Sequence, residues 1–347
     1  MREPFKIAGK ELLPGQRDFF EIEVASLFDY TQVSIPLEVV HGKEEGPTLF
    51  ISAAIHGDEI NGVEIIKRLR RHKALKRIKG TLIFAPIVNV FGFNAKSRYL
   101  PDRRDLNRSF PGTMKGSLAA RIAQIFMDEV VRKSDYGIDL HTGALNRMNY
   151  PQIRADVNDP ETKELVNAFG ATVNINSRLR DGSLREAARK EGVRILLFEG
   201  GEALRFDELS IRQGLHGCLG VLEKVGMIAP IKRKKTTKTP KKNKNVFYAE
   251  TSHWVRAPRS GSFVTKRKLG EILKPGDLLA TVSDPFGLNE EDLFAKNEGL
   301  IIGMSSMPLV NRGDAIFHIA YFQDFEEVED AFDLDVVEDS NLPESEE

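Results

Sequence analysis

Cysteine is nearly absent from this chain of 347 residues, because Cys218 is the only one. A single cysteine excludes an internal disulfide and a metal cluster built on thiolates, and it fits a reducing compartment. The sequence also lacks an apolar run close to the roughly 20 residues that a membrane-spanning helix needs. Its first residues lack the apolar core of a signal peptide. We therefore expect a cytoplasmic protein with no membrane partner.

Phosphate-binding loops are missing as well. Neither GxGxxG nor GxxxxGK occurs in the sequence, so a nucleotide cofactor is not indicated.

The charge is balanced overall, with a formal net charge of -1, but it is distributed unevenly. Residues 232–244 contain eight Lys or Arg and no acid, whereas residues 324–347 contain twelve acids and no Lys or Arg. The basic run has none of the interleaved aromatic residues with which single-stranded nucleic acids stack. We interpret residues 231–245 as a linker without a nucleic-acid partner. The acidic residues 324–347 are too charged to pack and are expected to form a disordered tail.

The composition is otherwise that of a globular protein, with 41% hydrophobic and 29% charged residues. The length suits one large domain and one small one. We assign the large domain to residues 1–230 and the small one to residues 246–323.

The large domain alternates short apolar runs with helical patterns. Residues 48–55 and 81–89 are rich in Ile, Leu, Val and Phe without a clean period of two, as in strands that are covered on both faces. Between them, residues 59–72 repeat apolar side chains at helical spacing. The same reasoning predicts helices at 118–133 and 161–170 and strands at 136–141 and 193–201. This order predicts an α/β fold in which helices flank a mixed or mainly parallel sheet.

The small domain has a different texture. Short β-rich segments are separated by GD, PG and NRG turn signals about every ten residues. This pattern predicts a small β-barrel or sandwich over residues 246–323.

Three side chains are spaced as ligands of a metal ion. His56 and Glu59 lie where a predicted strand gives way to a helix, and His141 lies at the end of another predicted strand. Open sheets bind ligands beyond the carboxyl ends of their strands, and a catalytic zinc ion commonly takes three protein ligands and a water. We predict a zinc site at these residues. Asp139 would share a strand face with His141 and would either support it or bond to nearby backbone.

Four motifs occur in a fixed order: HGDE at 56–59, SRYLPDRRDLNRSFPG at 97–112, DLHTG at 139–143 and LFEGG at 197–201. Together they resemble the succinylglutamate desuccinylase and aspartoacylase family, which is related to the zinc carboxypeptidases. The resemblance extends over roughly residues 20–325. It implies a zinc-carboxypeptidase-like mixed sheet, one zinc ion per subunit and hydrolysis of an amide.

The resemblance also implies a general base. Glu199 ends an apolar run and precedes two glycines, where a carboxylate can project into a cleft. By resemblance it takes a proton from water and passes it to the leaving amine. Glu202 is the alternative.

Polar residues of the second motif are candidates for binding the substrate and for stabilising the transition state. Asn107 and Arg108 suit a clamp on a substrate carboxylate, because a guanidinium matches a carboxylate with two parallel hydrogen bonds. By resemblance Arg98 stabilises the oxyanion of the tetrahedral intermediate. Arg103 and Arg104 lie close by and are alternatives for that role.

The small domain resembles the barrel-sandwich fold of biotinyl and lipoyl carriers. Those carriers modify a lysine in a hairpin turn, but the corresponding residues 305–308 read SSMP. We therefore expect a lid that shapes the entrance to the active site. His253, Trp254 and His318 would face substrate or, alternatively, pack in a core.

These observations lead to one main expectation and two alternatives. The chain is expected to be a zinc-dependent hydrolase that removes an acyl group from an N-acyl amino acid or a similar carboxylate-bearing amide. The alternatives are a metallocarboxypeptidase acting on peptide C-termini and a non-catalytic metal-binding module. Whether it forms a homo-oligomer stays open.

Overall fold

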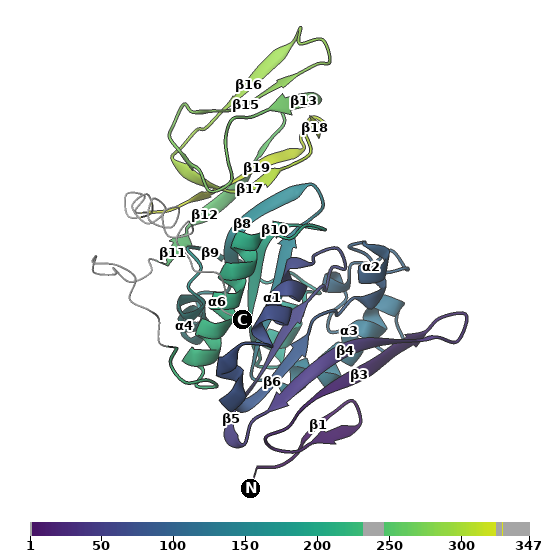
Figure 1. Cartoon of the computed structure of the whole chain (residues 1–347). Helices are drawn as coiled ribbons and strands as arrows, with labels where there is room; N and C mark the ends of the chain where they lie inside the picture. Colours follow the sequence, from purple (N-terminus) through teal and green to yellow (C-terminus); the bar gives the residue numbers. More distant parts are fainter. Residues whose placement is uncertain (1, 232–245, 324–327, 329–347) are drawn as a thin grey trace.

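The computed structural model describes residues 2–231, 246–323 and 328. The predicted basic linker, apart from residue 231, and the predicted acidic tail, apart from residue 328, lie outside these residues. Figure 1 shows a large α/β part, from which the C-terminal β region (residues 246–323) projects at one end.

A large mixed sheet runs through both parts. Within the described residues it has thirteen strands, and its main path has the order β12-β19-β17-β8-β10-β7-β5-β6-β4-β3. The bounds in this order are Thr251–Arg256, Ala315–Tyr321, Gly299–Ser305, Arg147–Ala155, Arg194–Glu202, Tyr136–Gly143, Glu44–Ala53, Lys79–Ala85, Gln32–His41 and Arg17–Ser26. Off this path, β9 (Val173–Asn176) pairs with β8 and β11 (Phe247–Ala249), and β14 (Ile272–Leu273) pairs with β17.

The centre of the sheet is parallel. β5 lies between β6 and β7 and is parallel to both, and β7 is parallel to β10. β8 and β4 then pair antiparallel with β10 and β6. The central strands bury Ile, Leu, Val and Phe on both faces, which explains why their sequences lack a clean alternation. The predicted mixed α/β sheet is confirmed.

Helices cover both faces of the parallel centre (Figure 1). One hydrophobic cluster joins the sheet to α1 (Asn61–Leu69), α4 (Pro160–Phe169) and α6 (Glu208–Lys224). A second cluster joins the other face to α2 (Val90–Ala95), α3 (Leu118–Glu129) and α5 (Leu184–Lys190). Short 3-10 turns occupy Lys73–Arg77, Leu106–Arg108 and Val131–Lys133.

Local sequence explains where these helices begin. The side chains of Ser117, Asp159, Ser183 and Asp207 each accept a backbone N–H in the first turn of α3, α4, α5 and α6. Such caps satisfy donors that the helix itself cannot pair. No helix among residues 2–231 and 246–323 has both the length and the apolar character needed to cross a membrane.

Side-chain alternation decides which face of the sheet each predicted site residue reaches. Leu140 of β7 and Phe198 of β10 pack into the cluster of α1, α4 and α6. Because successive side chains of a strand point to opposite faces, Asp139, His141 and Glu199 point to the face covered by α2, α3 and α5. The register also pairs Glu199 directly with His141 across β10 and β7.

The C-terminal β region adds a second sheet, confirming the predicted small β fold. Within the described residues this sheet has the order β16-β15-β13-β18, with bounds Glu290–Phe294, Leu278–Ser283, Gly261–Val264 and Leu309–Val310. It shares a hydrophobic cluster with β17 and β19 that includes Phe263, Leu279 and Phe317. A small hairpin of β1 (Phe5–Ile7) and β2 (Lys10–Leu12) lies near the N-terminus.

The two parts of the molecule are joined by hydrogen bonds between strands, which the sequence did not lead us to expect. β17 of the C-terminal β region pairs antiparallel with β8, and Gly303 lies opposite Asn149. The hydrogen-bonded ladder of the large sheet therefore continues from β8 of the α/β part into the C-terminal β region.

Candidate active site

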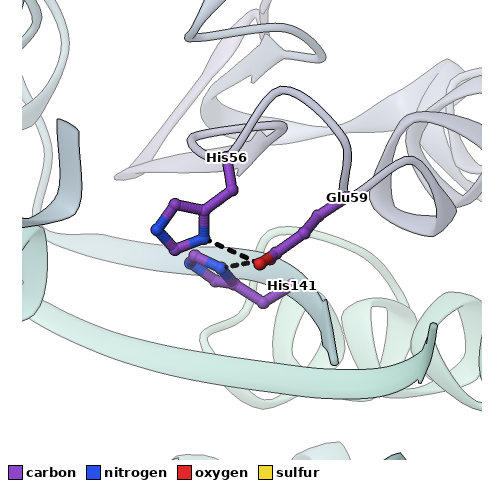
Figure 2. A group of neighbouring side chains, drawn as sticks. All are labelled: His56, Glu59 and His141. Carbon is purple, nitrogen blue, oxygen red and sulfur yellow. Dashed lines mark hydrogen bonds and ion pairs between the residues drawn. The ribbon is translucent and has the colours of Figure 1, made fainter. Parts of the chain in front are cut away.

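Three buried side chains meet at the carboxyl end of the parallel strands. His56 and Glu59 come from the turn between β5 and α1, and His141 comes from β7. Figure 2 shows both imidazole rings directed at the Glu59 carboxylate, with His141 Nδ1 2.7 Å from Oε2 and His56 Nδ1 2.8 Å from Oε1. One donor atom from each residue lies within 4.8 Å of the other two. The structure thus brings the three predicted ligands together.

Two further carboxylates hold the outer nitrogens of the imidazole rings. His141 Nε2 lies 2.7 Å from Asp139 Oδ2, and His56 Nε2 lies 3.0 Å from Asp105 Oδ1. Asp139 in turn accepts a hydrogen bond of 2.8 Å from the Ser52 hydroxyl. Such partners fix the orientation of a ligating histidine. Of the two interpretations of Asp139, the contact with His141 is therefore the one found, whereas Asp105 was not anticipated.

The electrostatics of the centre favour a cation at its middle. Burial by itself would lower the pKa of both imidazoles, but the carboxylates of Glu59, Asp105 and Asp139 raise it above the usual value. His56 Nδ1 is buried and makes no hydrogen bond within the described residues, although it lies close to Glu59. Two imidazole nitrogens and one carboxylate are suitable donors for zinc. The residues present therefore fit a divalent metal ion.

Arg98 lies against this centre. Its Nη1 donates to Glu59 Oε1 at 2.9 Å, and its Nη2 donates to Asp105 Oδ2 at 3.2 Å. Burial would lower the pKa of Arg98, but these two carboxylates raise it, so the guanidinium stays charged. Arg103 and Arg104, the alternatives to Arg98, have exposed side chains.

Asn107 and Arg108 follow in the same loop. Asn107 is buried, and its Oδ1 accepts the backbone N–H of Leu184 at 2.9 Å, which leaves the amide nitrogen for other partners. Arg108 is exposed and donates to the carbonyl of Asn107. The charge of Arg108 nevertheless acts on the centre. Burial by itself would raise the pKa of Asp105, but His56, Arg98 and Arg108 bring that pKa below its usual range.

Glu199 lies beside His141 and is held by one hydrogen bond and one ion pair. Asn149 Nδ2 donates to Glu199 Oε2 at 3.1 Å, and Arg154 Nε lies 2.8 Å from the same oxygen. The side chain of Glu199 is 20% exposed, so small molecules can reach it. Glu202, the alternative general base, accepts hydrogen bonds from the Asn146 backbone N–H and the Ser306 hydroxyl.

Arg185 of α5 is a residue that the sequence did not single out. It is 9% exposed and donates to the carbonyls of Arg154 and Arg178 and to the Ser177 hydroxyl. Burial, assisted by Arg154, lowers its pKa to about 10, so it remains a cation at neutral pH. No carboxylate within the described residues forms an ion pair with it. A buried guanidinium bound to neutral groups is suited to an anionic ligand.

The C-terminal β region contributes to the sheet next to Asn149, which holds Glu199. His318 pairs with Gly303, which pairs with Asn149, and Trp254 pairs with His318. The rings of Trp254 and His318 stack at 4.7 Å. Burial and the nearby Arg154 lower the pKa of His318 to about 3, so the imidazole is neutral.

His253, the third aromatic candidate of this region, has the opposite orientation. It pairs with Ile319 and stacks on the Tyr321 ring at 4.9 Å. Since neighbouring residues of a strand point to opposite faces, His253 lies away from the face that carries Trp254.

Comparison with known proteins identifies relatives of this chain. Residues 45–225 match the succinylglutamate desuccinylase/aspartoacylase catalytic domain. Over 301 residues the chain is 27% identical to an N-alpha-acetyl-L-2,4-diaminobutyric acid deacetylase from Halomonas elongata, a match that covers 83% of this chain and 86% of that protein.

Solved structures have the same fold. The product-bound ectoine utilization protein EutE (DoeB) from Ruegeria pomeroyi superposes with a TM-score of 0.76 at 25% identity, covering 92% of this chain and 98% of that one. A succinylglutamate desuccinylase/aspartoacylase from Rhodobacter sphaeroides gives a TM-score of 0.75 at 24% identity, covering 88% and 96%.

The contact between Asp105 and His56 predicts a specific effect on metal binding. Replacing Asp105 with Asn keeps an acceptor for the ring but removes the charge, so we expect Zn²⁺ affinity to fall by about 10- to 100-fold. Competition with a chromophoric chelator measures the affinity. Asp102→Asn is the matched control, because Asp102 lies in the same loop and, among the residues that the structure describes, accepts hydrogen bonds from the backbone N–H groups of Arg104 and Ala119 alone. Equal affinities of the two variants would contradict a supporting role for Asp105.

Proposed function

The chain belongs to the succinylglutamate desuccinylase/aspartoacylase family, and from this membership we propose that it is a zinc-dependent hydrolase that removes the acyl group from an N-acyl amino acid. The observation that carries the proposal is the position of Glu199 beside His141, across adjacent strands at the edge of a buried His–Glu–His cluster. The name of the Halomonas elongata relative, a deacetylase of an acetylated amino acid, supports the same reaction class.

The metal ion has a defined place in this proposal. His56, Glu59 and His141 would hold it, with Asp105 and Asp139 fixing the two rings. A bound zinc ion supplies a water of lowered pKa and polarises the scissile carbonyl.

Glu199 is the proposed proton carrier. Its carboxylate takes a proton from the attacking water and delivers it to the leaving nitrogen. A hydrogen bond from Asn149 and an ion pair with Arg154 both fall on Oε2, which keeps this oxygen in place and leaves Oε1 for the proton. An amide nitrogen cannot leave as an anion at neutral pH, so this delivery completes the cleavage.

Arginine side chains complete the proposed site. Arg98 uses two of its five N–H groups on Glu59 and Asp105, so the others can donate to the oxyanion that forms on the substrate. Asn107 and Arg108 are the proposed clamp on the substrate carboxylate, and Arg185 adds a buried positive charge on the same face. These groups favour an amide that carries a carboxylate.

A pair of variants separates metal binding from proton transfer. Glu199→Gln is expected to retain zinc and to lose about 10²- to 10⁴-fold in kcat, because the amide cannot accept the proton. His141→Ala is expected to lose the metal itself. Metal content by atomic emission and initial rates measure both, and Glu298→Gln at an exposed position is the control. A fully active Glu199→Gln enzyme would remove Glu199 from the mechanism.

The reaction class is tested with a substrate panel. The zinc-loaded protein is expected to release the free acid from N-acetyl, N-formyl or N-succinyl amino acids, with the released amine followed by a fluorogenic reagent. Blocking the substrate carboxylate as an amide should reduce kcat/KM by about tenfold or more, because an arginine then loses its charged partner. Release of C-terminal amino acids from peptides without any deacylation would instead identify a carboxypeptidase.

A further inference from the structure

A cavity of about 200 Å³ lies at the end of the sheet away from the proposed metal centre. Its walls come from the first residues of β10, from the C-terminal part of α5 and from residues just before and within the first turn of α4. Arg194, the first residue of β10, lines the cavity, and Glu199 lies five residues or about 16 Å further along this strand. The cavity is therefore separate from the metal ligands.

Three guanidinium groups and two carboxylates line this cavity. Arg189 forms an ion pair with Asp156, and Arg194 pairs with Asp159 at 2.9 Å. Arg185 is the fifth charged residue, and no carboxylate of the described part of the chain forms an ion pair with it. The walls thus carry one positive charge in excess.

Arg185 supplies this excess charge from a buried position. It is 9% exposed, and its Nη atoms donate to the carbonyls of Arg154 and Arg178 and to the Ser177 hydroxyl. Among the described residues these bonds use at most three of its five N–H groups. Burial and the nearby Arg154 lower the pKa of Arg185 to about 10, so its surroundings compensate the charge only in part. A buried guanidinium of this kind gains from an anion that can reach it.

The size and the remaining walls of the cavity favour one class of anion. Leu179, Val193 and Ile195 contribute apolar side chains. The volume equals that of roughly six water molecules at about 30 Å³ each, which suits a carboxylate of about four carbon atoms. Because only one positive charge is in excess, a monoanion fits better than a doubly charged phosphate.

Arg185 also connects the cavity to the proposed site of chemistry. It donates to the carbonyl of Arg154, and the Arg154 side chain forms the ion pair with Glu199. The charges of Glu199 and Asp139 raise the pKa of Arg185, although by less than burial lowers it. An anion bound at Arg185 therefore neutralises a charge that acts on the face of the sheet where the substrate carboxylate is proposed to bind.

We propose that this cavity is a binding site for a short-chain carboxylate, separate from the active site, and that its occupant weakens substrate binding through Arg185. The binding site itself goes beyond the proposed function, whereas the effect on substrate binding rests on it. The acid that a hydrolase of N-acyl amino acids releases belongs to the same class of ligand. Occupancy of the cavity would thus couple substrate binding to the accumulation of product.

Titration calorimetry of the zinc-loaded protein with sodium butyrate, at constant ionic strength, tests the site without any turnover. Butyrate is expected to bind, and the neutral 1-butanol is expected to bind at least about tenfold more weakly, because it lacks the charged partner of the guanidinium. Inorganic phosphate is also expected to bind more weakly than butyrate. No binding of butyrate, or tighter binding of phosphate, would overturn the assignment.

Two substitutions change the charge of the cavity in opposite directions. Arg189→Ala leaves Asp156 without its partner and is expected to weaken butyrate binding by about tenfold or more. Asp156→Asn leaves the Arg189 cation unpaired and is expected to strengthen it. Lys190→Ala is the matched control, because Lys190 is exposed in the same turn of α5 and is not part of the cavity wall, so its affinity should equal that of the wild type.

A further variant separates the cavity from the active site. Arg108 belongs to the proposed clamp on the substrate carboxylate, so butyrate that binds there would be lost in Arg108→Ala. Butyrate that binds in the cavity is expected to retain its affinity in this variant. Equal affinities of the wild type and Arg189→Ala, or loss of binding in Arg108→Ala, would overturn the site.

Initial rates test the link to substrate binding. With an N-acetyl amino acid that the protein hydrolyses, butyrate is expected to raise KM by about fivefold and then to reach a plateau, because it does not take the place of the substrate. KM of Arg189→Ala should stay unchanged at the same concentrations. A rise without a plateau, or one that persists in Arg189→Ala, would show direct competition and overturn the link. If no acylated amino acid is hydrolysed, the deacylase proposal fails, while the calorimetry still decides the site.

Discussion

The buried carboxylate of Glu59 is the group around which the centre is organised. It is 2% exposed, and its oxygens contact the Nδ1 atoms of both histidines, the Thr142 backbone N–H and Arg98. Burial by itself would raise its pKa, but His56 and His141 bring it below the usual range. A carboxylate without partners at this depth would cost several kcal/mol. The turn after β5, the end of β7 and the Arg98 loop must therefore meet at one point.

The side chains around Glu59 are held in turn by neighbouring polar residues. Asp105 and Asp139 hold the outer nitrogens of the histidines, and Asn149 holds Glu199. Asn149 lies opposite Gly303 of the C-terminal β region, and a Cβ at that position would lie only 3.0 Å from Asn149 Oδ1, so the glycine leaves room for this side chain. The strand pairing of β8 with β17 thus makes the C-terminal β region part of the surroundings of Glu199, beyond the lid expected from the sequence.

Several parts of this arrangement could be predicted because they depend on local sequence. Apolar runs without alternation identified the buried strands, and a histidine at the end of two such runs identified the centre. The alternation of a strand also correctly predicted that Asp139 shares a face with His141. These features need only the period of a strand and the rule that open sheets bind ligands at one edge.

Other parts depend on contacts between distant segments. Asp105 reaches His56 through a loop whose path the sequence does not reveal, although an acid among the arginines of residues 103–108 was a usable signal. Arg185 lies in an ordinary-looking amphipathic helix, and only the packing of α5 buries it. The pairing of Gly303 with Asn149 joins segments about 150 residues apart, and a register of that kind has no local pattern.

The proposed ligands of the zinc ion are His56, Glu59 and His141. Anomalous diffraction at the zinc absorption edge from a crystal of the zinc-loaded protein tests this most directly. We expect a single strong peak within about 2.0–2.2 Å of Nδ1 of both histidines and of a Glu59 oxygen. A peak only at other residues would contradict this assignment.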